Sequence, residues 1–502
     1  MQDTDGSDIN ERPLITGHHG PKNQITALAC NPKVDEFTTG AQDGTLRVWS
    51  VSKLKLLRLA KMDGAVMCVS YSPDRQRLAV ALEPRSGIDA GTGDKKAGTL
   101  MILTEDDLSV IHETQDSGKA LTKLTYSPDG TTLASASADT NIYVYSAVDD
   151  TYELLCKCEA HTSPIRNLDF DVSGEHLQST SFQVGRGSDD DSDALLYHGT
   201  IDGVQEKNRS ELQDVEWATW TCTEGWPVQA LAASADLKSS QINSVDRSHD
   251  GQKLAMGDAL GRVRMYHYPI PEKGFRFSDS RGHCDAVNEV RFTVGDSHLI
   301  TVGGLEDKAI FQWRVVEDTV GNTADSGSGD GDVEAAAAAE AKEASDETDG
   351  PEEHQLNTRG RTEIFSTATC ENNFFEMREL PHREAKKKPW ELAAHAPGEP
   401  KKIDPLEPGD DMRLDWIHGY SASISRNNLW YTADKGCIVY PAAGVGVLYN
   451  VPKHIQVRSW SSCVHVPQQI QLSQRMSTWD KWETLIIILW KVCSRTHFLP
   501  LT

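Results

Sequence analysis

The chain of 502 residues has ten cysteines but no C-x-x-C motif, and Cys156 and Cys158 are its only close pair. This arrangement matches no common zinc motif and shows no disulfide framework. The apolar run "LIIILW" at residues 485–490 is far shorter than the about 20 residues that cross a membrane. No secretory leader is visible in the N-terminal "MQDTDGSDINERP". We therefore expect a protein of the reducing cytoplasm without a membrane anchor.

Positive charge is scarce as well, since the formal net charge is −25 at pH 7. Nucleic acids are bound by basic stripes, so we expect no nucleic acid partner. Catalytic patterns are also missing, because no nucleophile with its base, no metal-ligand cluster and no phosphate loop is visible. Gly444-x-Gly446 lacks the third glycine and the helix of a dinucleotide fingerprint, and close strand packing is its expected role. The sequence thus predicts a protein that is not an enzyme and binds no cofactor or metal.

Acidic residues are concentrated in residues 317–360, which hold thirteen of them against only Lys342 and Arg359. The runs "DSGSGDGD" and "SDETDGPEE" in this segment are too polar and charged to form a core. We interpret the segment as a disordered acidic linker. An EF-hand calcium loop is the alternative, but the glutamate that such a loop requires is missing.

Six copies of one short phrase occur in residues 13–316, with a period near forty residues that two insertions lengthen to 55 and 76. Each copy has a strand, a polar turn rich in Pro, Asp and Gly, and a second strand, as in "YSPDGTTLASAS". The copies begin at Cys30, Tyr71, Tyr126, Phe170, Asp246 and Phe292. This pattern predicts an all-β fold, a β-propeller of about six four-stranded blades. We expect "RPLIT" at residues 12–16 to be the outer strand of the last blade and so to close the ring.

Two copies carry polar residues at fixed offsets that predict a buried hydrogen-bonded tetrad in each blade. The two sets are His18, Thr39, Asp43 and Trp49, and His283, Thr301, Asp307 and Trp313. Their role is structural rather than catalytic, because the same arrangement repeats. Copy three has no Gly-His, and copy five has Leu260 and Tyr266 at the Asp and Trp positions. We expect these two blades to depend on packing.

These motifs resemble those of tryptophan-aspartate (WD) repeat propellers. More specific phrases resemble the second propeller of the echinoderm microtubule-associated protein-like family, namely "GTLMILTEDDLSVIHE" (98–113), "ELQDVEWATWTCTEGWPVQAL" (211–231) and "GHCDAVNEVRFTVGDSHLITVGGLEDKAIFQWRVV" (282–316). Beyond the linker, "LDWIHGYSASISRNNLWYTADKGCIVYPAAGVGVLYN" (414–450) resembles that family's HELP motif. The order of these parts is similar to that of the long members with several propeller units.

The HELP segment is expected to form two alternating strands, residues 427–434 and 436–450. From Val457 onward the sequence has neither a blade pattern nor a family resemblance, and we interpret residues 457–502 as an atypical tail from an alternative or wrongly assigned terminus. Without the propeller that should follow, the HELP strands would leave four apolar side chains uncovered: Trp430, Tyr431, Val439 and Val447. The predicted parts are a disordered N-terminus (1–12), a propeller (13–316), an acidic linker (317–360), a basic segment with the HELP motif (361–456) and the tail.

The resemblance implies a cytoskeletal protein that binds tubulin or microtubules through its propeller. The alternative is a general scaffold that holds other proteins on the propeller face and has no affinity for tubulin. No heptad pattern is present, so we expect a monomer. A basic segment is the candidate contact for an acidic tubulin tail, with a solvated linker as the alternative. Its basic residues are Arg383, Lys386, Lys387, Lys388, Lys401 and Lys402.

Three tryptophans, Trp217, Trp220 and Trp226, lie within ten residues. In an extended "VEWATWTC" the first two would point to opposite faces and could not share one core. We expect Trp217 in the outer strand of the fourth blade. The cluster is also the candidate seam against a second propeller, with local packing and a direct partner contact as alternatives.

Overall fold

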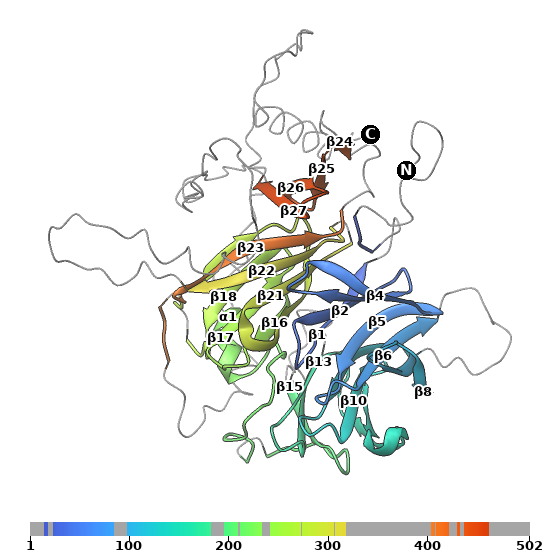
Figure 1. Cartoon of the computed structure of the whole chain (residues 1–502). Helices are drawn as coiled ribbons and strands as arrows, with labels where there is room; N and C mark the ends of the chain where they lie inside the picture. Colours follow the sequence, from blue (N-terminus) through green and yellow to red (C-terminus); the bar gives the residue numbers. More distant parts are fainter. Residues whose placement is uncertain are drawn as a thin grey trace, which may run out of the picture. The chain divides into compact units, whose positions relative to one another are not determined.

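The computed structural model describes residues 15–18, 24–84, 98–181, 195–208, 211–232, 241–317 except 273 and 306, 403–420 except 407, 429–431 and 436–460. The predicted all-β fold is confirmed. The strands of this described part form seven antiparallel sheets, six with four strands and one with three. Figure 1 shows six of these sheets as successive blades, coloured from blue to yellow.

The first three blades follow the chain order without interruption. Blade one contains β1 (Ile25–Cys30), β2 (Glu36–Ala41), β3 (Thr45–Ser50) and β4 (Lys55–Lys61). Blade two contains β5 (Gly64–Tyr71), β6 (Arg77–Pro84), β7 (Gly98–Thr104) and β8 (Val110–Ser117). Blade three contains β9 (Leu121–Tyr126), β10 (Thr132–Ser137), β11 (Asn141–Ser146) and β12 (Leu154–Glu159).

Blade four is the three-stranded sheet of β13 (Ile165–Phe170), β14 (His176–Ser181) and β15 (Leu195–Gly199). Blade five contains β16 (Ile242–Arg247), β17 (Lys253–Asp258), β18 (Arg262–His267) and β19 (Ser278–Arg281). Blade six contains β20 (Val287–Phe292), β21 (His298–Gly303), β22 (Ile310–Glu317) and β23 (Asp410–His418). The short α1 (Gln229–Ala232) precedes blade five.

Tight turns join the strands where the sequence has Asp-Gly. Gly44, in the turn between β2 and β3, has a φ of 73°, and Gly130, between β9 and β10, has a φ of 76°. Glycine reaches this left-handed region without strain, so it fits a short hairpin. The strands on either side alternate between core and neighbour contacts, and most of their apolar side chains are buried.

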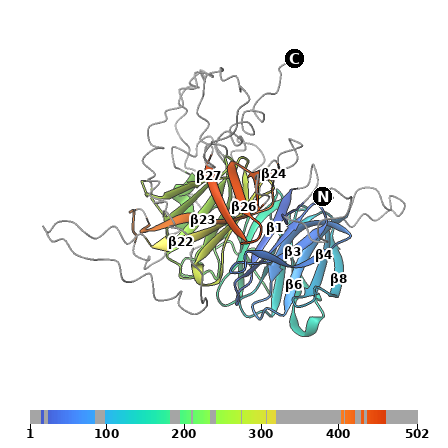
Figure 2. The same ribbon diagram turned by 45° about the horizontal axis from the view of Figure 1, so that its top comes forward.

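The outer strand of blade six is not the one expected from the sequence. β22 pairs with β23, from Glu317 opposite Asp410 to Ile310 opposite His418, although 92 residues separate the two strands in the chain. Figures 1 and 2 show them side by side, in yellow and orange. Ile15 and Thr16, the described part of "RPLIT", form no strand. The edge of β22 is therefore covered by the first part of the HELP segment instead of the N-terminus.

The rest of the HELP segment forms the seventh sheet, with β24 (Trp430–Tyr431), β25 (Cys437–Ala442), β26 (Val445–Asn450) and β27 (Ile455–Trp460). The expected single strand over residues 436–450 is a hairpin, because the chain turns at Ala443, whose φ is 51°. β27 also crosses the predicted boundary at residue 457, since it pairs with β26 along its whole length.

The apolar face of this seventh sheet is covered by the same chain, contrary to expectation. Val439 and Val447 are 4% and 0% exposed. Val447, Ile438 and Tyr440 belong to one core cluster with β23 and blades five and six. Gln456 fixes this contact, because its Nε2 donates to the backbone oxygen of Ile417 over 2.9 Å and its Oε1 accepts from the backbone N–H of that residue over 3.1 Å. The side chains of Trp430 and Tyr431 lie outside the described residues.

His418, at the end of β23, joins blade six to blade one. The centroid of its ring lies 4.7 Å from that of Trp49 and 5.8 Å from that of Phe37. Burial, with a smaller effect of His454, lowers the pKa of His418 to about 3. In the folded protein the imidazole of His418 therefore stays neutral at pH values where an ordinary histidine already takes up a proton.

This burial predicts a pH-dependent stability. An unfolded histidine titrates near pH 6.5, so acid favours the unfolded chain. Above pH 6.5, His418 does not lower the free energy of unfolding. As the pH falls from 6.5 toward 3 that free energy decreases, because only the unfolded chain binds the proton. Between pH 7.5 and 5 the loss should be about 2 kcal/mol in the free energy of unfolding. Urea titrations of the parent chain and of His418→Phe should show that the variant loses less by this amount. The half-buried His267 serves as the control, and an equal pH dependence for His418→Phe and His267→Gln would contradict the prediction.

Candidate functional site

The innermost strands of the six blades carry a repeated device at their second position. The backbone bulges there in most of them, which turns the side chain toward the next blade. In five of the six blades this side chain donates a hydrogen bond to a backbone oxygen of the following inner strand. The donors and acceptors are Thr26 to Val66, Thr122 to Ile165, Arg166 to Asn243, Asn243 to Val287 and Asn288 to Ile25.

The last of these bonds closes the ring. Nδ2 of Asn288 in β20 lies 3.0 Å from the backbone oxygen of Ile25 in β1, across 263 positions of the sequence. β1 and β20 are direct neighbours in space. The first and last blades thus meet through their inner strands, where a buried carbonyl oxygen would otherwise lack a partner.

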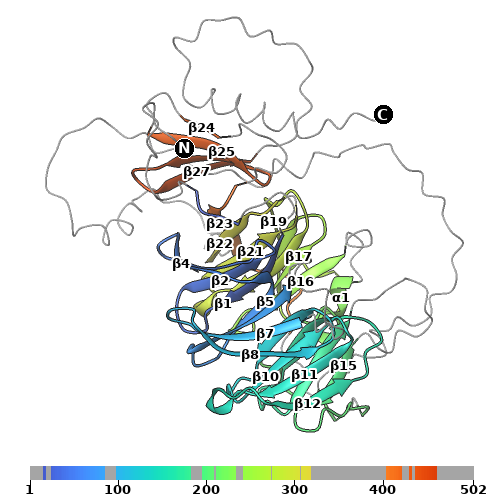
Figure 3. The ribbon, with the colours of Figure 1, turned by 90° about the vertical axis from the view of Figure 1, so that its right-hand side faces the viewer.

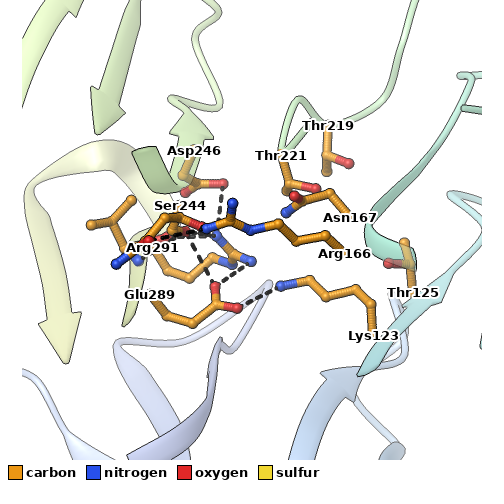
Figure 4. A network of polar contacts seen from close by, with 12 residues as sticks. Lys123, Thr125, Arg166, Asn167, Thr219, Thr221, Ser244, Asp246, Glu289 and Arg291 are labelled. Carbon is orange, nitrogen blue, oxygen red and sulfur yellow. Dashed lines mark hydrogen bonds and ion pairs between the residues drawn. The ribbon is translucent and has the colours of Figure 1, made fainter. Parts of the chain in front are cut away.

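An ion pair crosses the ring from blade three to blade six, which are opposite one another in a ring of six. Nζ of Lys123 donates to Oε1 of Glu289 over 2.9 Å, and their side chains are 11% and 19% exposed. Figure 4 shows this contact at the centre of a network of polar side chains from β9, β13, β16 and β20. A pair this well covered is screened by salt much less than a surface pair.

Arg291 extends the network toward blade five. Its guanidinium lies 2.8 Å from Glu289 and 3.9 Å from Asp246. Burial raises the pKa of Asp246 to about 6, because Arg291 and the backbone N–H of Phe292 offset the loss of water only in part. Burial acts on Glu289 in the same direction, but Arg291 and Lys123 outweigh it and hold the pKa of this carboxyl below its ordinary value. Glu289 is thus the carboxylate that both Lys123 and Arg291 contact.

Asp169 in β13 anchors the segment that contains the tryptophans. Its carboxylate accepts hydrogen bonds from the hydroxyl of Thr219 over 2.6 Å and from the backbone N–H groups of Thr221 and Cys222 over 2.9 and 3.1 Å. From blade five, Arg247 donates to the backbone oxygens of Trp217 and Ala218. The segment therefore lies between blades four and five and is held by a carboxylate on one side and a guanidinium on the other.

Two expectations about the tryptophans are wrong. Trp217 is not in an outer strand, because its isolated bridge is to Asp171, directly after the inner strand β13. Trp217 and Trp220 also share one core cluster, since the backbone between them is not extended. They are 8% and 4% exposed, and their rings pack against Tyr197 and Tyr268. Local packing between blades thus accounts for both.

Gly225 shows how tightly this segment is packed. Its φ is 123°, and a Cβ atom at this position would lie 2.7 Å from the ring of Trp220. No other residue type fits that place. Trp226, which follows, is only half-buried. It is the one tryptophan of the three for which a seam against a second propeller remains a proposal.

The tetrad residues lie together in blades one and six. In blade six, Nδ1 of His283 donates to Asp307 over 2.5 Å, the hydroxyl of Thr301 lies 2.7 Å from Nε2 of His283, and the indole N–H of Trp313 donates to that hydroxyl over 3.0 Å. In blade one the corresponding distances for His18, Thr39, Asp43 and Trp49 are 3.2, 2.9 and 2.8 Å. Thr45 adds a further hydroxyl bond to Asp43.

Blades three and five hold polar groups that the sequence motifs did not indicate. In blade three, the carboxylate of Asp139 accepts from Tyr143 over 2.8 Å and from Ser117, the last residue of β8, over 3.0 Å. In blade five, Asp258 accepts from the side chain of Arg262 over 2.7 Å and from its backbone N–H over 3.0 Å. These blades do not depend on packing alone. The sequence does show the aspartate in each hairpin. Its partners were missed because serine, tyrosine or arginine takes the place of the histidine.

The contacts of Lys123, Asp246, Glu289 and Arg291 form a network across the ring, here called the axial network, which sequence reasoning missed. Its members are ordinary residues on inner strands, and only the closure of the ring brings them together. The described residues contain no group of three or more His, Cys, Asp or Glu side chains able to hold a metal ion. They also contain no helix that is both long and apolar enough for a membrane span. The basic segment with Arg383 to Lys402 lies outside the described residues.

Comparison with known proteins supports two parts of this architecture. The family model of the echinoderm microtubule-associated protein second beta-propeller matches residues 25–315, and that of the HELP motif matches residues 407–447. The chain is 30% identical over 307 residues to echinoderm microtubule-associated protein-like 3 of Homo sapiens, which is 61% of this chain and 31% of that protein. It is 34% identical over 312 residues to echinoderm microtubule-associated protein-like 1 of Mus musculus, 61% of this chain and 34% of that protein. The chain thus spans about a third of the length of these relatives.

The tetrads predict a loss of stability on truncation of their aspartates. Asp307→Ala should lower the free energy of unfolding by about 1–3 kcal/mol, because it leaves the buried His283 without an acceptor. Asp43→Ala should cost less, since the hydroxyl of Thr45 lies 3.1 Å from Nδ1 of His18 and can replace the lost acceptor. Urea titrations would measure both, with the exposed Glu113→Ala as the control. Equal stability of Asp307→Ala and Glu113→Ala would show that the tetrad contributes nothing.

The axial ion pair predicts a coupling energy between opposite blades. Lys123→Met and Glu289→Gln should each cost about 1–3 kcal/mol, because each leaves a largely buried partner uncompensated. The double variant should cost less than the sum of the two. The exposed pair Lys157 and Glu159 serves as the control, and the same exchanges there should give a coupling of about 0–1 kcal/mol. Additive losses for Lys123 and Glu289 would mean that the pair does not link the blades.

Proposed function

The chain belongs to the echinoderm microtubule-associated protein-like family, and on that premise we propose that it binds tubulin or microtubules through its propeller. The observation that carries the proposal is the family match over residues 25–315, which covers all six inner strands of the closed ring. The relatives are named as echinoderm microtubule-associated protein-like proteins. The chain spans only about a third of their length, so whether this third is sufficient for binding is part of what must be tested.

The structure gives the proposal a physical basis in rigidity. The inner strands are linked by hydrogen bonds from blade to blade and by the pair of Lys123 and Glu289 across the ring. A rigid body loses little conformational entropy on docking, so its surface can bind a repeating lattice with few new contacts. The role is that of a non-enzymatic cytoskeletal protein in the cytoplasm, and the buried charges serve the fold.

A general scaffold without affinity for tubulin is the second candidate. Exposed apolar side chains such as Ile201, which is 84% exposed, and Leu155, 51% exposed, favour contacts with other proteins. The two candidates differ in one measurable property. Only the first requires that the protein pellet with polymerised tubulin or bind tubulin dimers in solution.

Cosedimentation with microtubules and gel filtration with unpolymerised tubulin test the proposal. A monomer offers one binding site per molecule, so we expect weak binding. Fusion to a dimeric coiled coil should strengthen binding to the lattice by about 10²–10⁴ fold through avidity. Substitution of Arg383, Lys386, Lys387, Lys388, Lys401 and Lys402 by alanine separates the propeller from the basic segment. Binding should survive that substitution.

Two results would contradict the proposal. If neither the monomer nor the coiled-coil fusion bound microtubules or dimers, the scaffold function would be favoured. If the alanine variant lost all binding while keeping the stability of the parent, the basic segment and not the propeller would be the tubulin contact.

A further inference from the structure

One edge strand of this acidic protein is strongly basic. The run "VSKLKLLRLAK", residues 51–61, has four basic residues and no acidic one, in a chain with a net charge of −25. It contains β4, the last strand in the sheet order of blade one. Figure 3 shows β4 on the outer side of that blade. Its outer edge therefore has backbone N–H and C=O groups that no neighbouring strand of the blade satisfies.

Both faces of β4 carry exposed side chains, because the strand bulges at Leu57 and this places Lys55 on the opposite face from Leu59 and Lys61. Lys55 and Lys61 at the two ends of the strand are exposed, and Leu59 between them is 53% exposed. Lys53, in the turn before the strand, is exposed as well. Among the described residues, no carboxylate lies within 4.0 Å of these three lysines, since Arg58 alone of the four basic residues forms ion pairs.

Arg58 holds the strand in place and leaves its lysines available. Its guanidinium bonds to the carboxylates of Glu36 and Glu105 and donates to the backbone oxygens of Glu105 and Asp106 over 2.8 and 3.2 Å. β4 is thus fixed to the hairpin of blade two that follows β7. A prepared edge of this kind costs a partner little ordering on that side.

The outer strands of blades two, three and five do not share this character. β8 carries Glu113 and Asp116, and in β12 the exposed Lys157 is paired with Glu159. In β19, Asp279 is paired with Arg264 and Arg281. Lysines on an edge strand can serve only to prevent aggregation. That role would be expected at each of these edges, whereas among the four outer strands compared the unpaired basic residues are concentrated on β4.

We propose that β4 binds an extended acidic segment of a partner protein as an added strand. The main-chain groups of the partner pair with the outer edge of β4. On one face a carboxylate meets Lys61 and an apolar side chain covers Leu59, and on the other face a second carboxylate meets Lys55. Because β4 has one extra residue at the bulge, the two carboxylates are five positions apart in the partner, which is roughly 17 Å when it is extended. This site does not depend on whether tubulin is a partner of the protein.

A labelled peptide tests the proposal on the full chain. The probe is a fluorescein-labelled peptide, EETVTEE, which has carboxylates at both ends and valine at the centre, and binding is followed by fluorescence anisotropy. Saturable binding is expected. The double variant Lys55→Glu, Lys61→Glu should weaken it by about tenfold or more. The double variant Lys119→Glu, Lys207→Glu makes the same charge change at exposed positions of blades three and four and should leave the affinity within about twofold.

A second peptide separates strand pairing from charge attraction. EEPVPEE has the same charge but cannot donate main-chain hydrogen bonds at its prolines, so it should bind about tenfold more weakly than EETVTEE. Equal binding of the two peptides would overturn the added strand. Equal losses in the two charge-reversed variants, whose stabilities must match that of the parent chain, would show general electrostatic attraction. Absence of saturable binding of EETVTEE would overturn the proposal as a whole.

Discussion

The ring of blades depends on one repeated contact, in which five of the six inner strands donate a side-chain hydrogen bond to a backbone oxygen of the next inner strand. Thr122, Asn243 and Asn288 make it with short polar side chains at the bulged second position, and Arg166 does so with a long one. The bond from Asn288 to Ile25 applies the same device between the last blade and the first. Closure therefore needs no exchange of strands between the chain termini. It follows from the same contact that joins blades in the middle of the chain.

Much of the fold was predictable because it is local. Each hairpin turn, the alternation of its two strands and the His, Thr, Asp and Trp of blades one and six lie within about forty residues, and such patterns can be recognised without knowledge of the whole. The pairing of β22 with β23 could not be predicted in this way. Nothing in "LDWIH" distinguishes a strand of the seventh sheet from one of blade six. The choice is made by the open edge of β22 and by the rings of Trp49 and Phe37, against which His418 packs.

The axial network was hidden for a different reason. Lys123 and Glu289 are 166 positions apart, and neither belongs to a motif. Their proximity results from the number of blades, since only a ring of six places the third opposite the sixth. The tryptophan segment was misjudged because an extended backbone was assumed. Asp169 accepts hydrogen bonds from three donors within residues 219–222, and these bonds bend the chain. Trp217 and Trp220 therefore pack in the same core cluster.

The separation of β22 from β23 bears on how the protein is made. A ribosome that adds about 5–20 residues per second needs roughly 5–20 s to pass from Glu317 to Asp410, because 92 residues lie between them. Through that interval the nascent chain holds five blades and most of a sixth, with the apolar edge strand β22 awaiting its neighbour. A chaperone that shields exposed strand edges would act on β22 during this interval. Its action would end when Trp416 and His418 leave the exit tunnel and β23 pairs with β22.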